Sequence, residues 1–323
     1  MAIEVYPNIY LQEVVLPNNP LKSINSFFVI SEDQCLMVDT GFNNEASMTA
    51  LKEGMAQFNR SFNQIDLFLT HLHADHCGLA GVFQRNGAKI YASEKDGNAI
   101  NEMQQAAYWE HYEALAGQMD LKRDQITFVD HPAIKYVADQ SIDFIPLVQG
   151  DELKVGSYTF QVLEVPGHTP GHLALYERDH GLLFGGDHIL DKITPNITFW
   201  DFNINSLGDY LESLKRISYL PIKVVFTGHR NLVHDAQGRI IQLLGHYGER
   251  LIEVMNILDQ GKATVRDVAS QMHWSIRAYG WGDFPSPQKW FAAGEAMSHL
   301  EYLVHGGKAK RTLEDGKLYY KRL

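Results

Sequence analysis

The sequence predicts an α/β protein of two domains, a larger one over residues 1–242 and a smaller one over residues 243–323. In the larger part, short apolar stretches of strand length alternate with segments of helical spacing. In the smaller part, three helical segments precede two short strands that flank a turn. The chain has 323 residues, of which 45% are hydrophobic, so it can bury one large core and a second, smaller one.

The first third of the chain predicts alternating strands and helices. Residues 26–30 and 35–38 are apolar and flank the polar run 31–34, which indicates paired strands joined by a turn. Residues 46–58 have helical spacing, with Met48, Leu51 and Met55 on one side. We then expect a strand over 65–69, a helix over 79–87 and a strand over 89–92.

Residues 98–119 predict helical structure with an aromatic face that includes Tyr108, Trp109 and Tyr112. Two interpretations stay open. The segment is either a lid or substrate-facing insertion, or a helix pair packed on the surface, because an aromatic stripe at helical spacing usually marks a core.

The rest of the larger part predicts three short strands, each of which breaks before a residue type that binds metals. The strand over 158–165 precedes His168, that over 182–184 precedes Asp187, and that over 224–227 precedes His229. A glycine stands at each break, where it lets the backbone turn sharply and approach closely. This repeated placement indicates that the three side chains meet in one site.

The strand over 65–69 leads into the densest group of such residues, the run THLHADHCG at positions 70–78. It brings four metal-binding side chains into one loop: His71, His73, Asp75 and His76. Imidazole and carboxylate ligands suit zinc, iron or manganese, whereas a structural zinc site would more often use cysteine. The sequence therefore predicts a catalytic metal centre.

Composition and charge narrow the classes of protein. The formal net charge is −11, which disfavours a surface that attracts nucleic acid or anionic membrane as a whole. No apolar run reaches the roughly 20 residues of a membrane helix, and the N-terminus lacks the pattern of a secretory signal. The two cysteines cannot form a disulfide framework. We expect a cytoplasmic protein.

The motifs THLHADH, PGHTPGH, GGD and GH, together with the early Asp39-Thr40-Gly41, occur in an order that resembles the metallo-beta-lactamase superfamily. The resemblance covers about the first three quarters of the chain and implies a four-layer αββα sandwich. It further implies two divalent metal ions, zinc or alternatively iron or manganese. By this resemblance the first metal ion is bound by His71, His73 and His168. The second metal ion is bound by Asp75, His76 and His229, and Asp187 bridges the two ions.

Several neighbouring residues are weaker candidates for a role in the site. Asp39 is expected either to hold a ligating histidine from behind or only to cap its strand. His172 is expected to support its loop, His188 to be a polar neighbour or to face substrate, and Cys77 to be a small buried residue.

The resemblance implies a hydrolase that uses a hydroxide bridging a dinuclear site, with Asp75 and Asp187 as catalytic residues. The favoured substrate is a small ester, thioester or lactone. Asp187 argues against a zinc beta-lactamase, and the absence of a tyrosine soon after it argues against a quorum-lactone hydrolase. An endoribonuclease or phosphodiesterase, a zinc beta-lactamase and a persulfide dioxygenase-like activity are kept as alternatives.

The last quarter predicts three helices followed by a hairpin. The first helix covers 243–258, the second starts at Thr264 with a capping box to Asp267, and the third follows Pro287. This order resembles the winged-helix domain of the lactamase-like 2 type of hydrolase. Nucleic-acid binding is not favoured, because the third helix carries Glu295 and Glu301 and the basic residues lie mainly in the hairpin. We expect the domain to pack on the metal domain, to wall a substrate cleft or to form a homodimer.

Overall fold

The computed structural model describes residues 1–17, 19–276 and 278–323. The strands are β1 (Ile3–Tyr6), β2 (Ile9–Val15), β3 (Ser23–Ile30), β4 (Cys35–Val38), β5 (Asp66–Phe68), β6 (Lys89–Ala92), β7 (Ile145–Pro146), β8 (Glu152–Val155), β9 (Tyr158–Glu164), β10 (Leu173–Glu177), β11 (Leu182–Gly186), β12 (Val224–Thr227), β13 (Ala263–Thr264), β14 (Ala309–Glu314) and β15 (Lys317–Arg322). The α-helices are α1 (Glu45–Gln57), α2 (Ala74–Cys77), α3 (Ala80–Arg85), α4 (Glu94–Glu102), α5 (Ala106–Gln118), α6 (Ser206–Ser218), α7 (Ala236–Leu258), α8 (Val265–Gln271) and α9 (Ser286–His305). Short 3-10 helices are η1 (Phe62–Gln64), η2 (Leu121–Asp124), η3 (Phe128–Asp130), η4 (Pro132–Lys135) and η5 (Trp281–Asp283).

Two sheets face each other at the centre of the larger part. The first has the strand order β1-β2-β3-β4-β5-β6-β7 and the second has the order β12-β11-β10-β9-β8. Their facing sides share one apolar core, in which Phe27 of β3 lies with its ring centroid 5.3 Å from those of both Phe184 of β11 and Phe226 of β12. The sheets are therefore the two inner layers of a sandwich.

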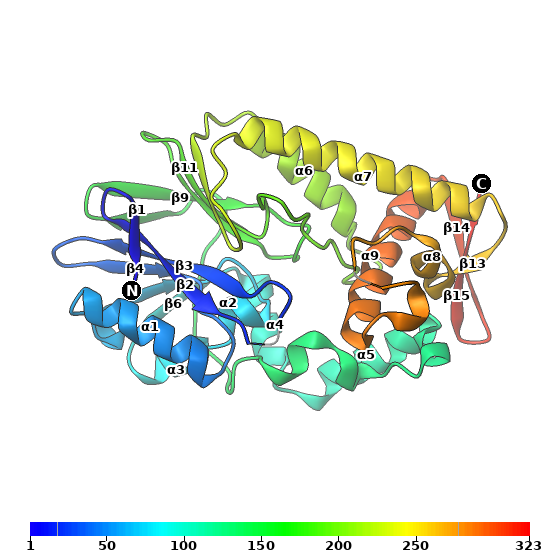
Figure 1. The fold of residues 1–323 in the computed structure, drawn as a ribbon, viewed down its shortest axis with the longest axis horizontal. Helices are drawn as coiled ribbons and strands as arrows, with labels where there is room; N and C mark the ends of the chain where they lie inside the picture. Colours follow the sequence, from blue (N-terminus) through cyan, green and yellow to red (C-terminus); the bar gives the residue numbers. More distant parts are fainter. Residues whose placement is uncertain (18, 277) are drawn as a thin grey trace.

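Helices cover the outer face of each sheet (Figure 1). Leu51 of α1 and Phe83 of α3 are buried against Leu67 of the first sheet. On the other side, Leu214 of α6 belongs with Leu183 of the second sheet to a separate core. The layer order is therefore helix, sheet, sheet, helix, which is the predicted αββα arrangement.

Parallel strand pairs bring the predicted site loops together. β4, β5 and β6 run parallel to one another, and β11 runs parallel to β12. Parallel neighbours end at the same edge of a sheet, so the segments that follow β4, β5, β11 and β12 emerge side by side. At this edge the backbone N–H of Asn25 donates to the carbonyl of Gly228 at 2.7 Å, which links the first sheet to the second.

The helical segment predicted over 98–119 is divided in the structure into two helices, α4 and α5, which is the helix pair of the second interpretation. The chain turns between them, where Gln105 adopts an extended conformation ahead of α5. The indole N–H of Trp109 donates to the carbonyl of Met103 at 2.9 Å, so this carbonyl is satisfied without a continuous helix. The packing that the second interpretation expects is observed for both helices. Ile100 of α4 lies in the core of the first sheet, and Leu115 of α5 lies in the C-terminal core.

The C-terminal part contains α8, α9 and a three-stranded sheet of order β13-β15-β14. Thr264 caps α8 in a capping box with Asp267, and β14 and β15 form the hairpin, as predicted. Helix α7 begins at Ala236, earlier than the predicted residue 243, because Asp235 caps it by accepting from the Gly238 N–H. The predicted domain boundary after residue 242 thus falls inside one helix (Figure 1). The division into two domains stays a prediction.

Helix α7 contributes to two cores along its length. Leu243 and Tyr247 lie in the core of the second sheet, whereas Val254 and Leu258 lie in the C-terminal core. Within the described residues, no helix combines the length and apolar character that a membrane crossing requires.

Candidate metal centre

The loop after β5 carries four of the seven predicted ligands. His71 and His73 stand on the loop itself, while Asp75 and His76 belong to the short helix α2 that follows. The Cys77 thiol donates to the Leu72 carbonyl at 3.0 Å, which closes the loop on itself. The four side chains are thereby presented from one compact turn.

The other three ligands come from the second sheet. Asp187 follows directly after β11, His229 lies just beyond the end of β12, and His168 lies on the turn between β9 and β10. Gly228 is required for close approach, because a Cβ at this position would lie 2.3 Å from Oδ1 of Asp187 and 2.7 Å from Cε1 of His76. A residue with a side chain would push these two groups apart.

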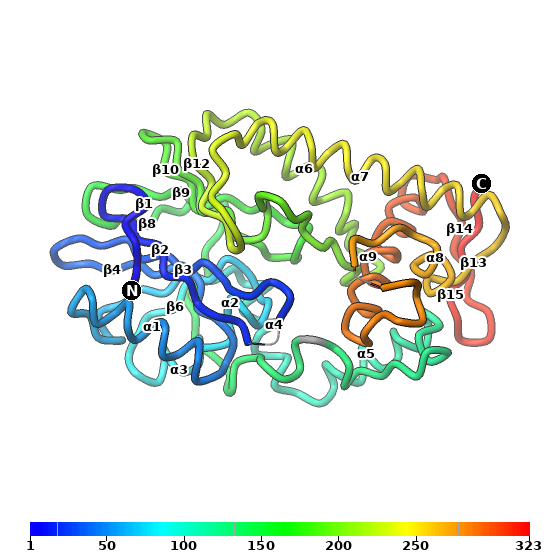
Figure 2. Tube along the Cα trace, viewed as in Figure 1, coloured from blue at the N-terminus to red at the C-terminus, as the bar shows by residue number. Residues whose placement is uncertain are grey.

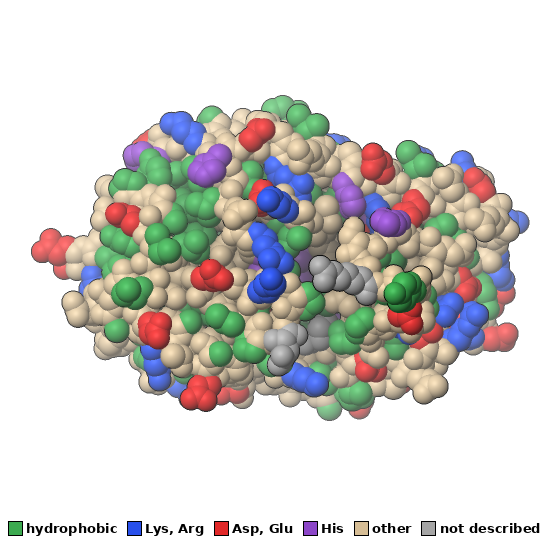
Figure 3. Space-filling model, in the orientation of Figure 1, with side chains coloured by type: hydrophobic (Ala, Val, Ile, Leu, Met, Phe, Trp, Pro, Cys, Tyr) green, Lys and Arg blue, Asp and Glu red, His purple; other side chains and the backbone are tan. Residues whose placement is uncertain are grey.

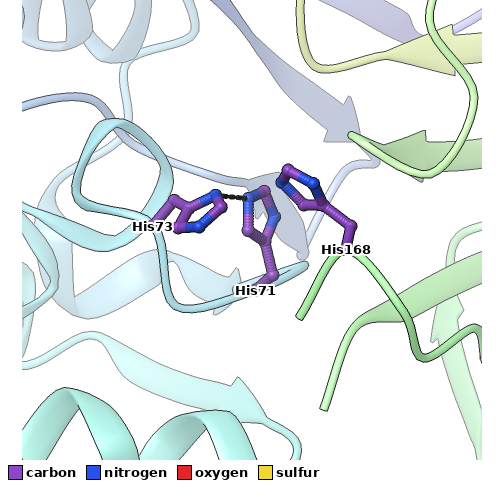
Figure 4. A group of neighbouring side chains, drawn as sticks. All are labelled: His71, His73 and His168. Atoms are coloured by element: carbon purple, nitrogen blue, oxygen red, sulfur yellow. Dashed lines mark hydrogen bonds between the residues drawn. The ribbon is translucent and has the colours of Figure 1, made fainter. Parts of the chain in front are cut away.

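The structure gathers all seven predicted residues into three overlapping groups, each with its potential ligand atoms within 4.8 Å of one another. The groups are His71, His73 and His168; His71, His76 and Asp187; and Asp75, His76 and His229. Figure 4 shows the first group, in which Nε2 of His71 and Nδ1 of His73 point toward each other at 3.1 Å. The first and third groups have the same members as the two triads implied by the resemblance.

Four histidines are oriented from behind by acceptors that engage Nδ1. Because a carbonyl or carboxylate oxygen only accepts, Nδ1 of His168, His229 and His76 donates, at 2.8 Å to the Asn196 carbonyl, at 2.8 Å to the Ser23 carbonyl and at 2.7 Å to Asp39. The Thr70 hydroxyl donates to Asp39 at 2.7 Å, so it accepts from Nδ1 of His71 at 2.9 Å. In the neutral form of each ring, which is the form that binds a metal, this leaves Nε2 with a lone pair.

In three of these four rings the buried Nε2 lacks a hydrogen-bond partner among the described residues. Nε2 of His76, His168 and His229, and Oδ1 of Asp187, have no hydrogen-bond partner among the described residues. Leaving a buried polar atom unsatisfied costs about 1–3 kcal/mol, so several in one place indicate a site that binds a cation. The donor set and the orientation of its lone pairs fit divalent metal ions such as zinc.

Asp187 lies at the centre of the cluster. Its carboxylate oxygens are 3.5 Å from Nε2 of His76, 3.7 Å from Nε2 of His168 and 3.5 Å from Nε2 of His229. A carboxylate within reach of histidines from both triads has the position that a bridging ligand needs.

The charges of the cluster are strongly coupled. Burial and the neighbouring His168 lower the pKa of His73 to about 3. Burial opposes a charge on His229, but the carboxylates of Asp187 and Asp75 outweigh it and raise its pKa to about 10. In the same way burial opposes the charge of Asp75, yet His229 lowers its pKa to about 2. Without a metal, protons on histidines balance the carboxylates, and a divalent cation competes with these protons.

The weaker candidates have structural roles. Asp39 holds His76, as one interpretation expected, and its φ of 58° aims the carboxylate back across the strand ends. Nε2 of His172 accepts from the Asp187 N–H at 3.2 Å, so this ring supports its loop. His188 is fully buried beside Tyr210, and Cys77 is buried with its pKa raised well above the usual value by burial.

Sequence reasoning missed Asp96, which ties the two ligand loops together. Its carboxylate accepts from the Leu72 N–H at 3.0 Å, from the Thr169 hydroxyl at 2.5 Å and from the Gly171 N–H at 2.7 Å. Asp96 stands in the first turn of α4, where an acidic residue is ordinary, so no sequence signal distinguished it. Asn196 and Trp200 were missed for a similar reason, because they lie in a segment without periodicity.

A cleft of about 510 Å³ begins beside the cluster, next to Leu72 and Trp200. The Trp200 ring is nearly parallel to that of His73, with centroids 6.1 Å apart. Farther along, the cleft is lined by Tyr108 and Tyr112 of α5, and the substrate-facing role of this segment stays a prediction. Figure 3 shows a hollow near the middle of one face, with histidine side chains inside it and Lys or Arg side chains beside it.

Comparisons with known proteins agree with this geometry. The family model described as "Metallo-beta-lactamase superfamily" matches residues 19–229. A probable metallo-hydrolase of Bacillus subtilis, YqjP, is 24% identical over 92% of this chain and 92% of its own length. An acyl-coenzyme A thioesterase of Bos taurus is 22% identical over 69% of this chain and 78% of its own. The crystal structure of a metallo-beta-lactamase family protein from Thermus thermophilus has a TM-score of 0.79 and 28% identity, and covers 99% of this chain and 100% of its own.

Proposed function

We propose that this chain, which belongs to the metallo-beta-lactamase superfamily and is a metallo-hydrolase, cleaves a small acyl thioester or a related ester or lactone. The observation that carries the proposal is the position of the cleft, which begins at Leu72 and Trp200 beside the histidine cluster and continues along Tyr108 and Tyr112. Its volume of about 510 Å³ lies within the range of about 300–1,000 Å³ that is common for small-molecule sites.

We assign the metal ligands as the sequence predicted them. His71, His73 and His168 would hold one divalent ion, Asp75, His76 and His229 a second, and Asp187 would contact both. Divalent ions held by these residues would supply Lewis-acid chemistry, which activates water as a nucleophile and polarises a carbonyl. The metal is proposed to be zinc, since the set is rich in imidazole.

The residues of the chain prepare the site for this chemistry. Asp39 and the carbonyls of Ser23 and Asn196 fix the ring orientations, so little reorganisation is needed when a substrate binds. Asp75 is half-buried, and its carboxylate lies 3.3 Å from Nε2 of His229, so with lone pairs to spare it would orient the attacking water or accept its proton.

The cleft favours a substrate with an apolar acyl group. Leu72, Ala99, Pro170 and Ile204 contribute apolar surface, and Tyr108 contributes an aromatic face. The relative in Bos taurus is named as an acyl-coenzyme A thioesterase, which supports a thioester as the first substrate to test.

The alternative of RNA cleavage has less support from the C-terminal hairpin, which we propose to be the wing of a winged-helix domain. Three of its cations are already paired with acidic side chains: Arg311 with Glu301, Lys317 with Asp120, and Arg322 with Asp259. Paired cations attract phosphates less, because an acidic neighbour offsets their charge. We therefore propose no nucleic-acid partner.

The test is a substrate panel with metal analysis of the purified protein. We expect about two equivalents of divalent metal, and turnover of acyl thioesters that stops with a chelator and returns with added zinc. Full turnover after complete metal removal, or cleavage of RNA alone, would contradict the proposal.

The variant Tyr108→Ala tests the cleft itself. We expect its KM for a long-chain acyl thioester to rise about tenfold with kcat nearly unchanged, because uniform binding of the acyl group is lost. The KM for an acetyl thioester should stay constant. Tyr219→Ala is the matched control, since the Tyr219 side chain is exposed on the surface.

A further inference from the structure

The segment 193–202, between β11 and α6, lies against the metal centre on one side. The Asn196 carbonyl accepts from Nδ1 of His168 at 2.8 Å, and Nε1 of Trp200 donates to the His168 carbonyl at 3.2 Å. The segment therefore holds His168 at both its ring and its backbone. Figure 2 shows the chain between β11 and α6 crossing the middle of the molecule toward α9.

On its other side the same segment is fastened to α9 of the C-terminal part. The Asn196 side-chain amide donates to Glu295 at 2.9 Å and to the Phe291 carbonyl at 3.4 Å. The Phe199 N–H donates to the Gly294 carbonyl at 3.0 Å, and the Phe199 side chain is buried in the C-terminal core. Since Asn196 takes part on both sides, one residue links His168 to α9.

The contact between the segment and α9 is close and leaves no free space. A Cβ at Gly294 would lie 2.1 Å from the Thr198 hydroxyl, so α9 needs a glycine where the segment crosses it. The Tyr247 hydroxyl of α7 donates to the Pro195 carbonyl, which adds a second helix to the attachment. The segment is thus held between the metal centre and two C-terminal helices.

Glu295 is itself held in place by charge. Its Oε1 lies 3.3 Å from Nη2 of Arg250, and Nη1 of Arg250 pairs with Glu253 at 2.8 Å and donates to the His273 carbonyl at 2.7 Å. The side chains of both Glu295 and Arg250 are about nine-tenths buried. A buried, ion-paired carboxylate adds little to the stability of a fold, because the cost of its desolvation offsets most of the attraction between the paired charges.

We propose that Glu295 is a positioning residue of the metal centre, which acts through Asn196 to set the orientation of the His168 ring. The inference rests on the proposed function, since it concerns the metal held by His168. Residues that orient a ligating histidine typically contribute 10–100-fold to metal affinity. The C-terminal part thereby belongs to the metal centre, although none of the proposed ligands comes from it.

The test measures the affinity of the protein for cobalt(II) and the visible spectrum of the cobalt(II) protein. We expect Asn196→Ala and Glu295→Ala each to weaken binding about tenfold and to change the spectrum. The double variant should also lose about tenfold rather than a hundredfold, because both changes break one link. Asn196→Asp keeps the shape but repels Glu295, so it should behave like Asn196→Ala.

Glu301→Gln is the matched control, since Glu301 is also a buried carboxylate of α9. It contacts Tyr320 and Arg311 on the hairpin side, so the change should lower stability but leave cobalt affinity and the spectrum unchanged. Asn196 lies in a loop, so its variants keep the test decisive if Glu295→Ala does not fold. Wild-type affinity in the Asn196 variants would overturn this inference alone, whereas a wild-type protein that binds no cobalt would overturn the proposed function as well.

Discussion

The carboxylate of Asp39 lies 2.7 Å from Nδ1 of His76, although the two residues are 37 positions apart in the chain. Asp39 follows β4 and His76 lies on α2 beyond β5, so the parallel pairing of β4 and β5 brings them together. The same carboxylate accepts from the Thr70 N–H at 2.8 Å and from the Thr70 hydroxyl at 2.7 Å. Both carboxylate oxygens of Asp39 are therefore needed as acceptors for these three donors.

Asp39→Asn should lower metal affinity about 10–100-fold. An amide nitrogen in place of one oxygen would face a donor, and if it faced His76 it would favour the tautomer with the proton on Nε2. That proton would occupy the lone pair that we assign to the metal. Competition with a chromophoric chelator measures the affinity. Asp66→Asn, at the opposite end of β5, is the control, and equal affinities in the two variants would contradict the assignment.

Asp187→Ala should remove about one equivalent of metal and reduce turnover about 100-fold or more, because its carboxylate reaches histidines of both triads. Elemental analysis after dialysis and steady-state kinetics measure the two effects together. Asp191→Ala serves as the control, since within the described part of the chain the Asp191 side chain accepts from Asn231 alone, at 2.9 Å. An Asp187→Ala protein that keeps both metals and its full rate would show that the bridging assignment is wrong.

Much of this site was predictable because several short apolar runs each lead into a residue type that binds metals. His168, Asp187 and His229 each follow a short apolar run and a glycine, so the sequence shows both the strand and its ligand. The αββα fold followed from the same motifs and is confirmed by the match to the superfamily and by the two facing sheets. The metal ligands themselves stay a prediction that the geometry supports.

Other features could not be predicted because they depend on contacts between distant segments. The break between α4 and α5 is stabilised by the hydrogen bond that Trp109 donates to the Met103 carbonyl. The helical periodicity of the sequence does not indicate this contact. The role of Asn196 depends on α9, about a hundred positions away in the chain. Trp274, Phe284 and Trp290 pack with Trp281 in the C-terminal core, whereas Tyr279 of the same region is fully exposed.

The hairpin offers a test of the RNA alternative. Lys308, Lys310 and Lys321 are exposed and have no ion pair among the described residues, whereas Arg311 is engaged with the buried Glu301 and is unsuitable for mutation. Replacing the three lysines by alanine should leave thioester turnover within about twofold of wild type, since surface changes away from a site rarely exceed about 0.5 kcal/mol. If the wild type cleaves RNA and the triple variant loses that activity selectively, the proposed substrate class is wrong.

The imidazole of His299 should make the metal-free protein less stable in acid. Burial and the nearby Arg250 lower its pKa from 6.5 to about 3, although Nδ1 donates to the Glu295 carbonyl at 2.8 Å. Between these two values the unfolded chain binds a proton that the folded chain does not. The contribution of His299 to the stability of the folded protein is therefore fully present above about pH 6.5. It declines by about 1.4 kcal/mol per pH unit as the pH falls toward 3.

His299→Gln tests this linkage, because its amide can still donate to the Glu295 carbonyl but does not titrate. Urea unfolding from pH 7.5 to 4.5, with a chelator present, should show a shallower loss of stability in this variant, by about one proton. His305→Gln is the control: Nδ1 of His305 donates to the Glu301 carbonyl at 2.8 Å in the same way, but this side chain is exposed. If wild type and His299→Gln lose stability in parallel as the pH falls, His299 does not take up a proton on unfolding and its burial is not the cause of acid sensitivity.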